Sequence, residues 1–323
     1  MLPMDLPTDM PSFMERFGTD EKCRVNLIEA RWPKGFCCGK CGHSRAWSHK
    51  KRLIEECAAC GKQHSLRAGT IFEQSKTGLA KWFLAIFLVT SSKRGIAAAE
   101  LQRQMGFASY QTAWTWLHKI RRAMVRPERE PLKGAVEADE TYIGGRKPGK
   151  RGRGAAGKAL VVGAVECRRE TVMDEKTEEE KVCLKLGRLR LAHVGDAGGA
   201  TLCGFISDNV RSKTPVMTDS AKAYSALAKE GYDHEPTNLS ASGPEGLQRL
   251  SAIHLVFGQL KRWLLGTHHG GQSPKHLPAY LDEFVFRFNR RTAKCLSHRF
   301  ARVLQIAVRT TPVSYAALVA ETS

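Results

Sequence analysis

Hydrophobic and polar residues alternate over residues 134–145, and this alternation predicts a β-strand. Val136 and Ala138 occupy one set of positions, while Glu137 and Asp139 occupy the other. The glycine pair at the end of the segment indicates a turn. A carboxylate at the end of a buried strand is costly unless it is hydrogen-bonded or holds a metal ion. Both interpretations of Asp139 stay open on this pattern alone.

A second apolar run, over residues 214–219, also predicts a strand and also ends in an aspartate, Asp219. Two strand-end aspartates in a basic protein favour a pair of carboxylates that holds a divalent metal ion beside a phosphodiester. Neighbouring patterns predict strands over residues 159–167 and 182–194 and helices over residues 198–209 and 221–231.

An apolar stripe predicts a helix over residues 250–265 that packs on the sheet. The stripe comprises Ile253, Val256, Phe257, Leu260 and Leu264. His254 and Lys261 lie seven residues apart, so two helical turns bring them within about 20° of each other near the edge of the stripe. Both side chains can therefore point toward the strand ends. Gly266 is expected to end this helix.

Helical patterns also fill the region before the first strand. A buried helix is expected over residues 79–90, a short one over 96–105 and a third over 109–125. The last two resemble a helix-turn-helix, although an ordinary helical linker domain has the same pattern. The late helix after residue 265 is expected to start with Ser273 as its N-cap and Pro274 at its first position.

Two C-x-x-C pairs predict a zinc ribbon, in which four thiolates hold one tetrahedral zinc ion. The pairs are Cys38 with Cys41 and Cys57 with Cys60. A glycine follows the second cysteine of each pair, where a tight turn requires a residue without Cβ. Four thiolates leave no open position for water, so the metal is expected to be structural; unmetallated thiols are the alternative.

The net charge of the chain indicates a polyanionic partner. Lys and Arg outnumber Asp and Glu by 51 to 32 in 323 residues, which gives a net charge of +19 and a pI near 9.7. Anionic membrane is the competing partner, but the apolar runs are far shorter than the ~20 residues of a span. The N-terminus shows no signal-peptide pattern. Scattered single cysteines fit a reducing cytoplasm, and a DNA partner would add association with the nucleoid.

A glycine-rich basic run over residues 146–158 is interpreted as a loop that binds DNA phosphates, with a solvated surface as the alternative. The late helices are expected to expose further cations, including Arg287. The candidate DNA-binding residues are Arg146, Lys147, Lys150, Arg151, Arg153, Lys158, Lys119, Arg121, Arg122, Arg262, Arg287, Arg290 and Arg291.

With these motifs together, the chain resembles bacterial insertion-sequence transposases of the ISXO type. The resemblance covers roughly residues 25–295. It is carried by RWPKGFCCGKCG with CAACGK, by ADETYIGG and MTDSAKAY, and by HLVFGQLKRWLLGTHHG running into HLPAYLDEFVFRFNRR. It implies an α/β architecture, a ribonuclease-H-like mixed sheet flanked by helices, after a small zinc ribbon and a helical segment.

The resemblance also implies a DDE-type transposase site. Asp139 and Asp219 match the first two catalytic acids, and the third ligand should lie seven residues before a basic residue. That position is His254, with Lys261 as the basic partner, which makes this a DDH variant. Imidazole suits Mn²⁺ better than Mg²⁺. A histidine with a purely packing role is the alternative, and Glu245 and Glu137 are then the fallback carboxylates.

The expected activity is metal-dependent cleavage of terminal inverted repeats in double-stranded DNA, followed by strand transfer. Two Mg²⁺ or Mn²⁺ ions would serve catalysis, and a homodimer or larger assembly would form on DNA. A DNA-binding regulator without strand transfer and a simple metal nuclease are the alternatives. The expected domains are a helix with the zinc ribbon over residues 1–74, a helix-turn-helix-like segment over 75–130, the catalytic domain over 131–300 and a C-terminal tail over 301–323.

Overall fold

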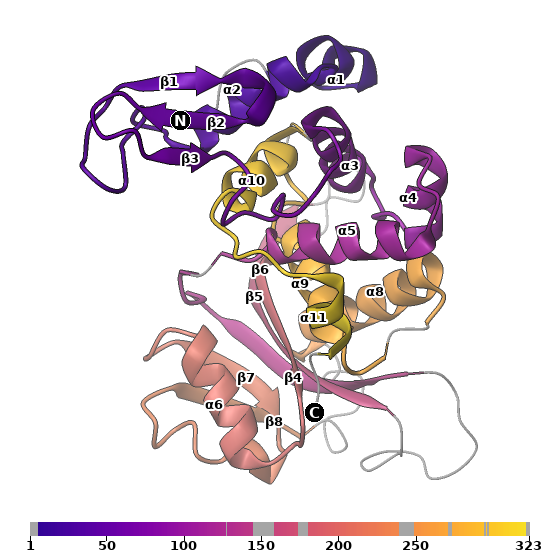
Figure 1. Cartoon of the computed structure of the whole chain (residues 1–323). Coiled ribbons are helices and arrows are strands. Elements are labelled where there is room, and N and C mark those ends of the chain that lie inside the picture. Colours follow the sequence, from indigo (N-terminus) through magenta and orange to yellow (C-terminus); the bar gives the residue numbers. More distant parts are fainter. Residues whose placement is uncertain are drawn as a thin grey trace. The chain divides into compact units, whose positions relative to one another are not determined.

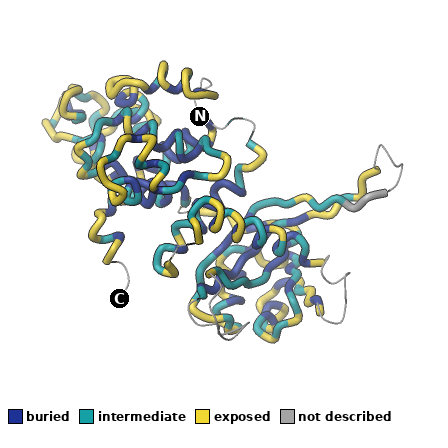
Figure 2. The backbone as a smooth tube through the Cα atoms, turned by 90° about the vertical axis from the view of Figure 1, so that its right-hand side faces the viewer, coloured by how far each residue is buried: buried dark blue, intermediate teal, exposed yellow. Residues whose placement is uncertain are grey.

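The computed structural model describes residues 6–126, 128–144, 158–173, 180–238, 249–270, 273–293, 295 and 297–320 (Figure 1). The chain separates into two compact units, Met1–Arg126 with Thr292–Ser323, and Pro127–Arg291. This division differs from the expected one, because the end of the chain is part of the first unit and not a separate tail. In each unit, buried segments lie inside and exposed segments outside (Figure 2). In the described part of the chain, every helix is too short or too polar to cross a membrane.

The first unit is helical around an aromatic core. Phe13 and Phe17 from the first helix pack against Phe300, and Phe83 and Phe87 also contact this ring. The helices at the two ends of this unit, before residue 18 and around and after residue 300, were not predicted, because their apolar patterns are short and weakly periodic. The described helices of this unit are α1 Met10–Phe17, α2 Asp20–Arg31, α3 Leu79–Ser91, α4 Ala98–Met105, α5 Tyr110–Arg122, α10 Ser297–Ala307 and α11 Tyr315–Ala320.

A small antiparallel sheet lies between α2 and α3 in the sequence. Its strands are β1 Ala46–His49, β2 Ile54–Cys57 and β3 Gln63–Ser65, in the order β1-β2-β3. A 3-10 turn, η1 (Lys50–Arg52), joins β1 to β2. The buried pair Arg24–Glu55, with 2.8 Å between nitrogen and oxygen, fastens β2 to α2. The expected ribbon is therefore confirmed as a separate three-stranded element.

The second unit is built on a mixed five-stranded sheet in the order β6-β5-β4-β7-β8. Strands β4, β5 and β6 are antiparallel neighbours, whereas β4, β7 and β8 run parallel. This order confirms the predicted ribonuclease-H-like mixed sheet; the short polar strand β8 was not predicted. The strands are β4 Val136–Ile143, β5 Ala159–Met173, β6 Glu180–Val194, β7 Pro215–Asp219 and β8 Asp233–Thr237.

Helices cover both faces of this sheet (Figure 1). On one face α6 (Gly199–Asn209) packs on alternate residues of β4, such as Val136. On the other, α8 (Ser251–His268) and α9 (Leu277–Phe288) pack on alternate residues of β5 and β6, including Val161. The predicted stripe of α8 is buried throughout. Because strand side chains alternate between faces, each residue of β4 is assigned to one helical layer.

Gly163 on β5 allows α8 to lie close to the sheet. A Cβ at this position would stand 2.9 Å from side-chain atoms of Leu191 and Phe257 and 3.0 Å from Ile253. Gly163 is also the cross-strand partner of Asp139. A residue with a side chain here would therefore displace α8 next to that aspartate.

Three details of the predicted elements are wrong. Residues 221–231 form a 3-10 turn, η2 (Lys222–Tyr224), and further turns, because buried Tyr224 and Leu227 are three residues apart and share the side of a 3-10 turn. Gly266 lies inside α8, which continues to a left-handed His269 cap with φ of 55°. The late helix begins at Leu277, after a turn whose N–H groups bond to the carbonyl of Ser273.

Candidate active site and zinc site

Asp139 and Asp219 lie on neighbouring parallel strands at the same level. The register pairs Glu137 of β4 with Met217 of β7. Two residues further along both strands, side chains point to the same face again, which puts Asp139 beside Asp219 on the face covered by α8. Asp139 lies in the middle of β4 and not at its end as predicted, because β4 continues to Ile143. Asp219 is the last residue of β7, as predicted.

His254 reaches this pair from the first turn of α8. Its Nε2 lies 3.0 Å from Oδ2 of Asp139, and the side chains of His254 and Asp139 are 35% and 14% exposed. The hydrogen bond to Asp139 raises the pKa of His254, while burial acts in the opposite direction. The predicted first acid and the predicted third ligand are therefore in direct contact.

Lys261 follows His254 by two helical turns and lies in the same electrostatic environment. Burial lowers the pKa of the Lys261 ammonium. The negative charge of Asp139 raises this pKa, and the positive charge of Lys158 lowers it. The face of α8 predicted from the sequence thus brings an imidazole and an ammonium to one edge of the carboxylate pair. Lys158 is an additional cation there.

The two aspartates are fixed by their own backbones. Asp139 Oδ1 accepts a hydrogen bond from the Glu140 N–H at 2.8 Å, and Asp219 Oδ1 accepts one from the Ala221 N–H at 3.1 Å. Two carboxylates and an imidazole are donors that Mn²⁺ and Mg²⁺ accept. Among the described residues, however, only the ribbon cysteines form a group of three or more ligand atoms within 4.8 Å of one another. The ligand atoms of Asp139, Asp219 and His254 are therefore not yet gathered as closely as a bound metal ion requires. His254 would have to exchange its contact with Asp139 for a metal ion.

Glu137, a fallback ligand in the sequence analysis, already has partners on both oxygens. It is fully buried, and its Oε2 accepts the Ile253 N–H at 3.0 Å while its Oε1 accepts Arg169 Nη2 at 2.8 Å. A carboxylate at the start of a helix also interacts favourably with the helix dipole. Glu137 therefore fixes the beginning of α8, and with it His254, to β4. The other fallback carboxylate, Glu245, lies outside the described residues.

A second buried contact, which sequence reasoning missed, joins the segment after β7 to β4. The Tyr224 hydroxyl donates to Glu140 Oε2 at 3.0 Å, and Tyr224 is fully buried. Burial and then the nearby carboxylates raise the pKa of Tyr224. Tyr224 belongs to the MTDSAKAY motif, so its position after Asp219 was the signal available in the sequence.

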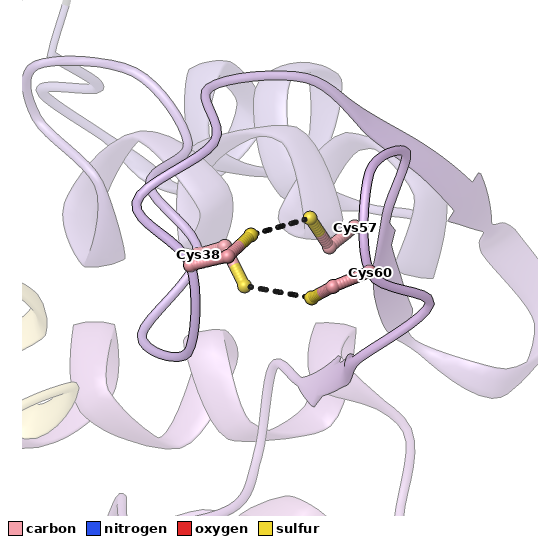
Figure 3. Close-up of side chains that lie close together, drawn as sticks. Cys38, Cys57 and Cys60 are labelled. Atoms are coloured by element: carbon pink, nitrogen blue, oxygen red, sulfur yellow. Dashed lines mark hydrogen bonds between the residues drawn. The ribbon is translucent and has the colours of Figure 1, made fainter.

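The four predicted zinc ligands are brought together from two turns of the ribbon (Figure 3). Their sulfur atoms all lie within 4.8 Å of one another. Within the group, Cys38 Sγ is 3.6 Å from Cys60 Sγ, and Cys41 Sγ is 3.5 Å from Cys57 Sγ. Sulfur atoms this close and turned inward match the donor set of a tetrahedral zinc site. The residues present therefore fit one structural zinc ion.

His64 of β3 adds a contact to this cluster that the spacing did not reveal. Its Nε2 lies 3.3 Å from Cys38 Sγ. Burial alone would raise the pKa of the Cys38 thiol. Hydrogen bonds from the N–H groups of Cys41 and Lys40 and from the His64 ring outweigh burial and lower this pKa to about 5. The neighbouring sulfur atoms outweigh the His43 N–H and raise the pKa of Cys41 to about 12. A divalent cation would relieve this competition among thiolates.

Several candidate DNA-binding cations are less accessible than expected. Arg287 is buried, in contrast to the prediction, because its guanidinium pairs at 2.8 Å with the fully buried Glu283 one helical turn earlier. Lys119 and Arg121 are buried as well, on the side of α5 that faces inward. Arg262 and Arg291 are exposed, whereas Arg122, Lys158 and Arg290 are half-buried. The candidates Arg146, Lys147, Lys150, Arg151 and Arg153 lie outside the described residues.

Comparison with known proteins gives one family match within the second unit and another over the ribbon. Residues 131–289 match the family described as ISXO2-like transposase domain, and residues 18–63 match the transposase zinc-ribbon domain. A Halobacterium salinarum protein named as an uncharacterized protein in transposable element ISH50 is 25% identical over 282 residues, which is 85% of this chain and 92% of the relative. No solved structure matches. This chain therefore belongs to the transposases that join an ISXO2-like transposase domain to an amino-terminal zinc ribbon.

Proposed function

We propose that this transposase binds the terminal inverted repeats of an insertion sequence, cleaves them and joins the freed ends to target DNA. The observation that carries the proposal is the placement of Asp139 and Asp219 at the same level of adjacent strands, with His254 of α8 in contact with Asp139. Unlike a carboxylate site that is merely packed, this group combines hard ligands with two neighbouring ammonium groups, those of Lys261 and Lys158.

Asp139, Asp219 and His254 would hold the divalent ions. When bound, such ions stabilise charge at phosphorus and lower the pKa of an attacking hydroxyl. In the first reaction a water oxygen forms a bond to phosphorus and the bond from phosphorus to the 3′ oxygen breaks. One water proton is released to solvent, and the leaving 3′ oxygen takes up a proton to become a hydroxyl. In the second, the freed 3′-hydroxyl attacks a target phosphodiester in the same way. Lys261 would bind a phosphate oxygen and keep the backbone in line.

The α4–α5 pair supports DNA binding by the first unit. Gly106 turns the chain between the helices with φ of 61°, and Ser109 caps α5 by accepting the Gln111 N–H at 3.1 Å. Tyr110, at 53% exposure, and the exposed Gln111 lie at the start of the second helix, where a helix-turn-helix contacts base edges. We expect a dimer or larger assembly on DNA, because the two ends of an element must be joined together.

A strand-transfer assay with pre-cut terminal repeats and Mn²⁺ tests the proposal. Asp139→Asn and Asp219→Asn should abolish cleavage and joining, while DNA binding without divalent metal stays intact. Asp233→Asn, at the exposed start of β8, is the matched control and should keep full activity. Wild-type cleavage in either active-site variant would show that the ligand is wrong; cleavage without joining in the parent protein would favour a simple nuclease.

His254 has its own test in the same assay. His254→Ala should abolish strand transfer, because the site then loses the ligand that α8 supplies. His254→Glu should restore part of the activity and shift the preferred metal from Mn²⁺ toward Mg²⁺, since a carboxylate is the harder ligand. Full activity of His254→Ala in both metals would leave His254 with only a packing role.

A further inference from the structure

The β1–β2 hairpin of the zinc ribbon combines an exposed indole with three consecutive cations. Trp47 on β1 is 68% exposed. The η1 turn that follows, Lys50–Arg52, consists of Lys50, Lys51 and Arg52, and all three side chains are exposed. Cations that bind phosphates, next to an aromatic ring that contacts bases, are the chemistry of nucleic-acid surfaces. Zinc binding by the ribbon does not need either feature.

The tip of this hairpin is held in a strained conformation. Leu53 ends the η1 turn with φ of 53°. For a residue with a side chain, the left-handed region costs roughly 1–2 kcal/mol. The Leu53 N–H bonds to the Lys50 carbonyl at 3.3 Å, and the Leu53 carbonyl accepts the Leu66 N–H at 2.9 Å. Strain of this kind gathers at functional sites, and here it fixes three cations on one turn.

The two faces of the hairpin have different roles. Glu55 on the inner face is buried and pairs with Arg24 of α2, so this face is fastened to the helix. Trp47 and its cross-strand partner Glu56 lie on the opposite face. The Gln63 amide and, against burial, the His49 ring lower the pKa of Glu56, so Glu56 is anionic at neutral pH. The negative charge of Glu56 repels phosphates from this face. It does not repel base edges, because these include amino groups that donate hydrogen bonds.

We propose that the β1–β2 hairpin enters the major groove of duplex DNA, with the η1 cations on the phosphates of one strand and Trp47 against the bases. This inference rests on the proposed function, because that function makes DNA the partner. A two-stranded ribbon fits a groove about 12 Å wide. The solvent-exposed contact of Lys50 with Glu21, at 3.6 Å, is weak enough to be exchanged for a phosphate.

Affinity and its salt dependence separate the two contributions. The zinc-loaded full chain is titrated, without Mg²⁺ or Mn²⁺, against labelled duplex carrying an element end, and anisotropy is measured at several salt concentrations. Changing Lys50, Lys51 and Arg52 together to Ala should make the slope of log affinity against log salt less negative by about 2–3. Trp47→Ala should weaken binding about 5- to 100-fold at each salt concentration and leave the slope unchanged, because the indole contacts base edges and not phosphates. Trp47→Phe should retain most of the affinity.

The matched control removes three exposed cations from the other unit. Arg211, Lys213 and Lys229 changed together to Ala alter net charge equally, at the end of β7 opposite Asp219, and should leave the slope nearly unchanged. Parental affinity in Trp47→Ala, or a parental slope in the η1 variant, overturns the proposal and leaves the hairpin to a protein partner. If the parent protein binds DNA through the hairpin but shows no strand transfer, the catalytic proposal alone is contradicted.

Discussion

At the scale of single residues, Glu137 and Tyr224 position the elements that carry the candidate ligands. Asp139, Asp219 and His254 themselves were predicted from local patterns and from the family resemblance, although Asp139 lies within β4 and not at its end. The partners of Glu137 and Tyr224 lie 116 and 84 positions away in the chain, at Ile253 and Glu140. Such contacts depend on which strands and helices become neighbours, so no local pattern predicts them.

Glu137→Gln should destabilise the second unit by roughly 1–3 kcal/mol, the usual cost of weakening hydrogen bonds to a buried charged group. The amide keeps the shape but leaves Arg169 without its carboxylate partner at this contact. Denaturant unfolding measures the change. Glu235→Gln, on the exposed side of β8, is the control and should shift the midpoint little. Equal midpoints for the two variants would mean that the Glu137 contacts contribute little.

Glu166 should make stability depend on pH. Burial raises its pKa, but the Arg188 guanidinium and the N–H groups of Lys133 and Arg188 outweigh this and lower the pKa below 4.5. A carboxyl with a lowered folded-state pKa stabilises the fold above its unfolded pKa and loses that effect as pH falls through the folded value. Glu166→Gln should therefore cost about 1–3 kcal/mol at pH 7.

The difference between this variant and the parent should shrink between pH 7 and about pH 3, as the Glu166 carboxyl takes up a proton and becomes uncharged like the amide. Urea midpoints at the two pH values give the comparison. An Arg188→Lys variant, which keeps the charge but cannot reproduce the guanidinium contacts, should lie between the parent and Glu166→Gln at pH 7. A cost for Glu166→Gln that does not change with pH would assign its effect to packing.

At the scale of elements, packing decides where α8 stands. Gly163→Ala adds one methyl group between α8 and the sheet, next to three buried side chains. Overpacking of this kind should destabilise the second unit by about 1–3 kcal/mol and reduce strand transfer, because His254 moves with the helix. Gly204→Ala on the exposed side of α6 is the control, since its Cβ meets nothing within 4 Å, and should stabilise slightly. Unchanged stability in Gly163→Ala would show that α8 adjusts freely.

Long periodic elements were predicted well, and short or exposed ones were not. The buried helix α3, the stripe of α8 and the presence of four of the strands follow from apolar runs with clear periods. The strand β8 was missed because its residues, Asp-His-Glu-Pro-Thr, are mostly polar and contain a proline. The turns after Asp219 were predicted as a helix because Tyr224 and Leu227 are apolar at a spacing that α and 3-10 geometry share.

At the scale of the whole molecule, the zinc ribbon and the catalytic unit should respond separately to loss of metal. Structural zinc in small modules contributes roughly 10–16 kcal/mol to folding. Cys38→Ser should therefore lose zinc and unfold the ribbon, while residues 134–295 stay folded. Metal analysis and limited proteolysis measure the two effects. Cys37→Ser, at the exposed neighbouring thiol, is the control and should keep its zinc. A zinc-free parent protein would contradict the site itself.

The first unit is discontinuous in the chain, and this has a consequence for synthesis. Phe300 of α10 completes an aromatic core whose other rings, such as Phe13 and Phe87, are made more than two hundred residues earlier. On the ribosome the catalytic unit can thus fold before the unit that precedes it is finished. A chain that stops short of residue 297 leaves those phenylalanines exposed to chaperones and proteases. Incomplete transposase should therefore be removed before it occupies the ends of the element.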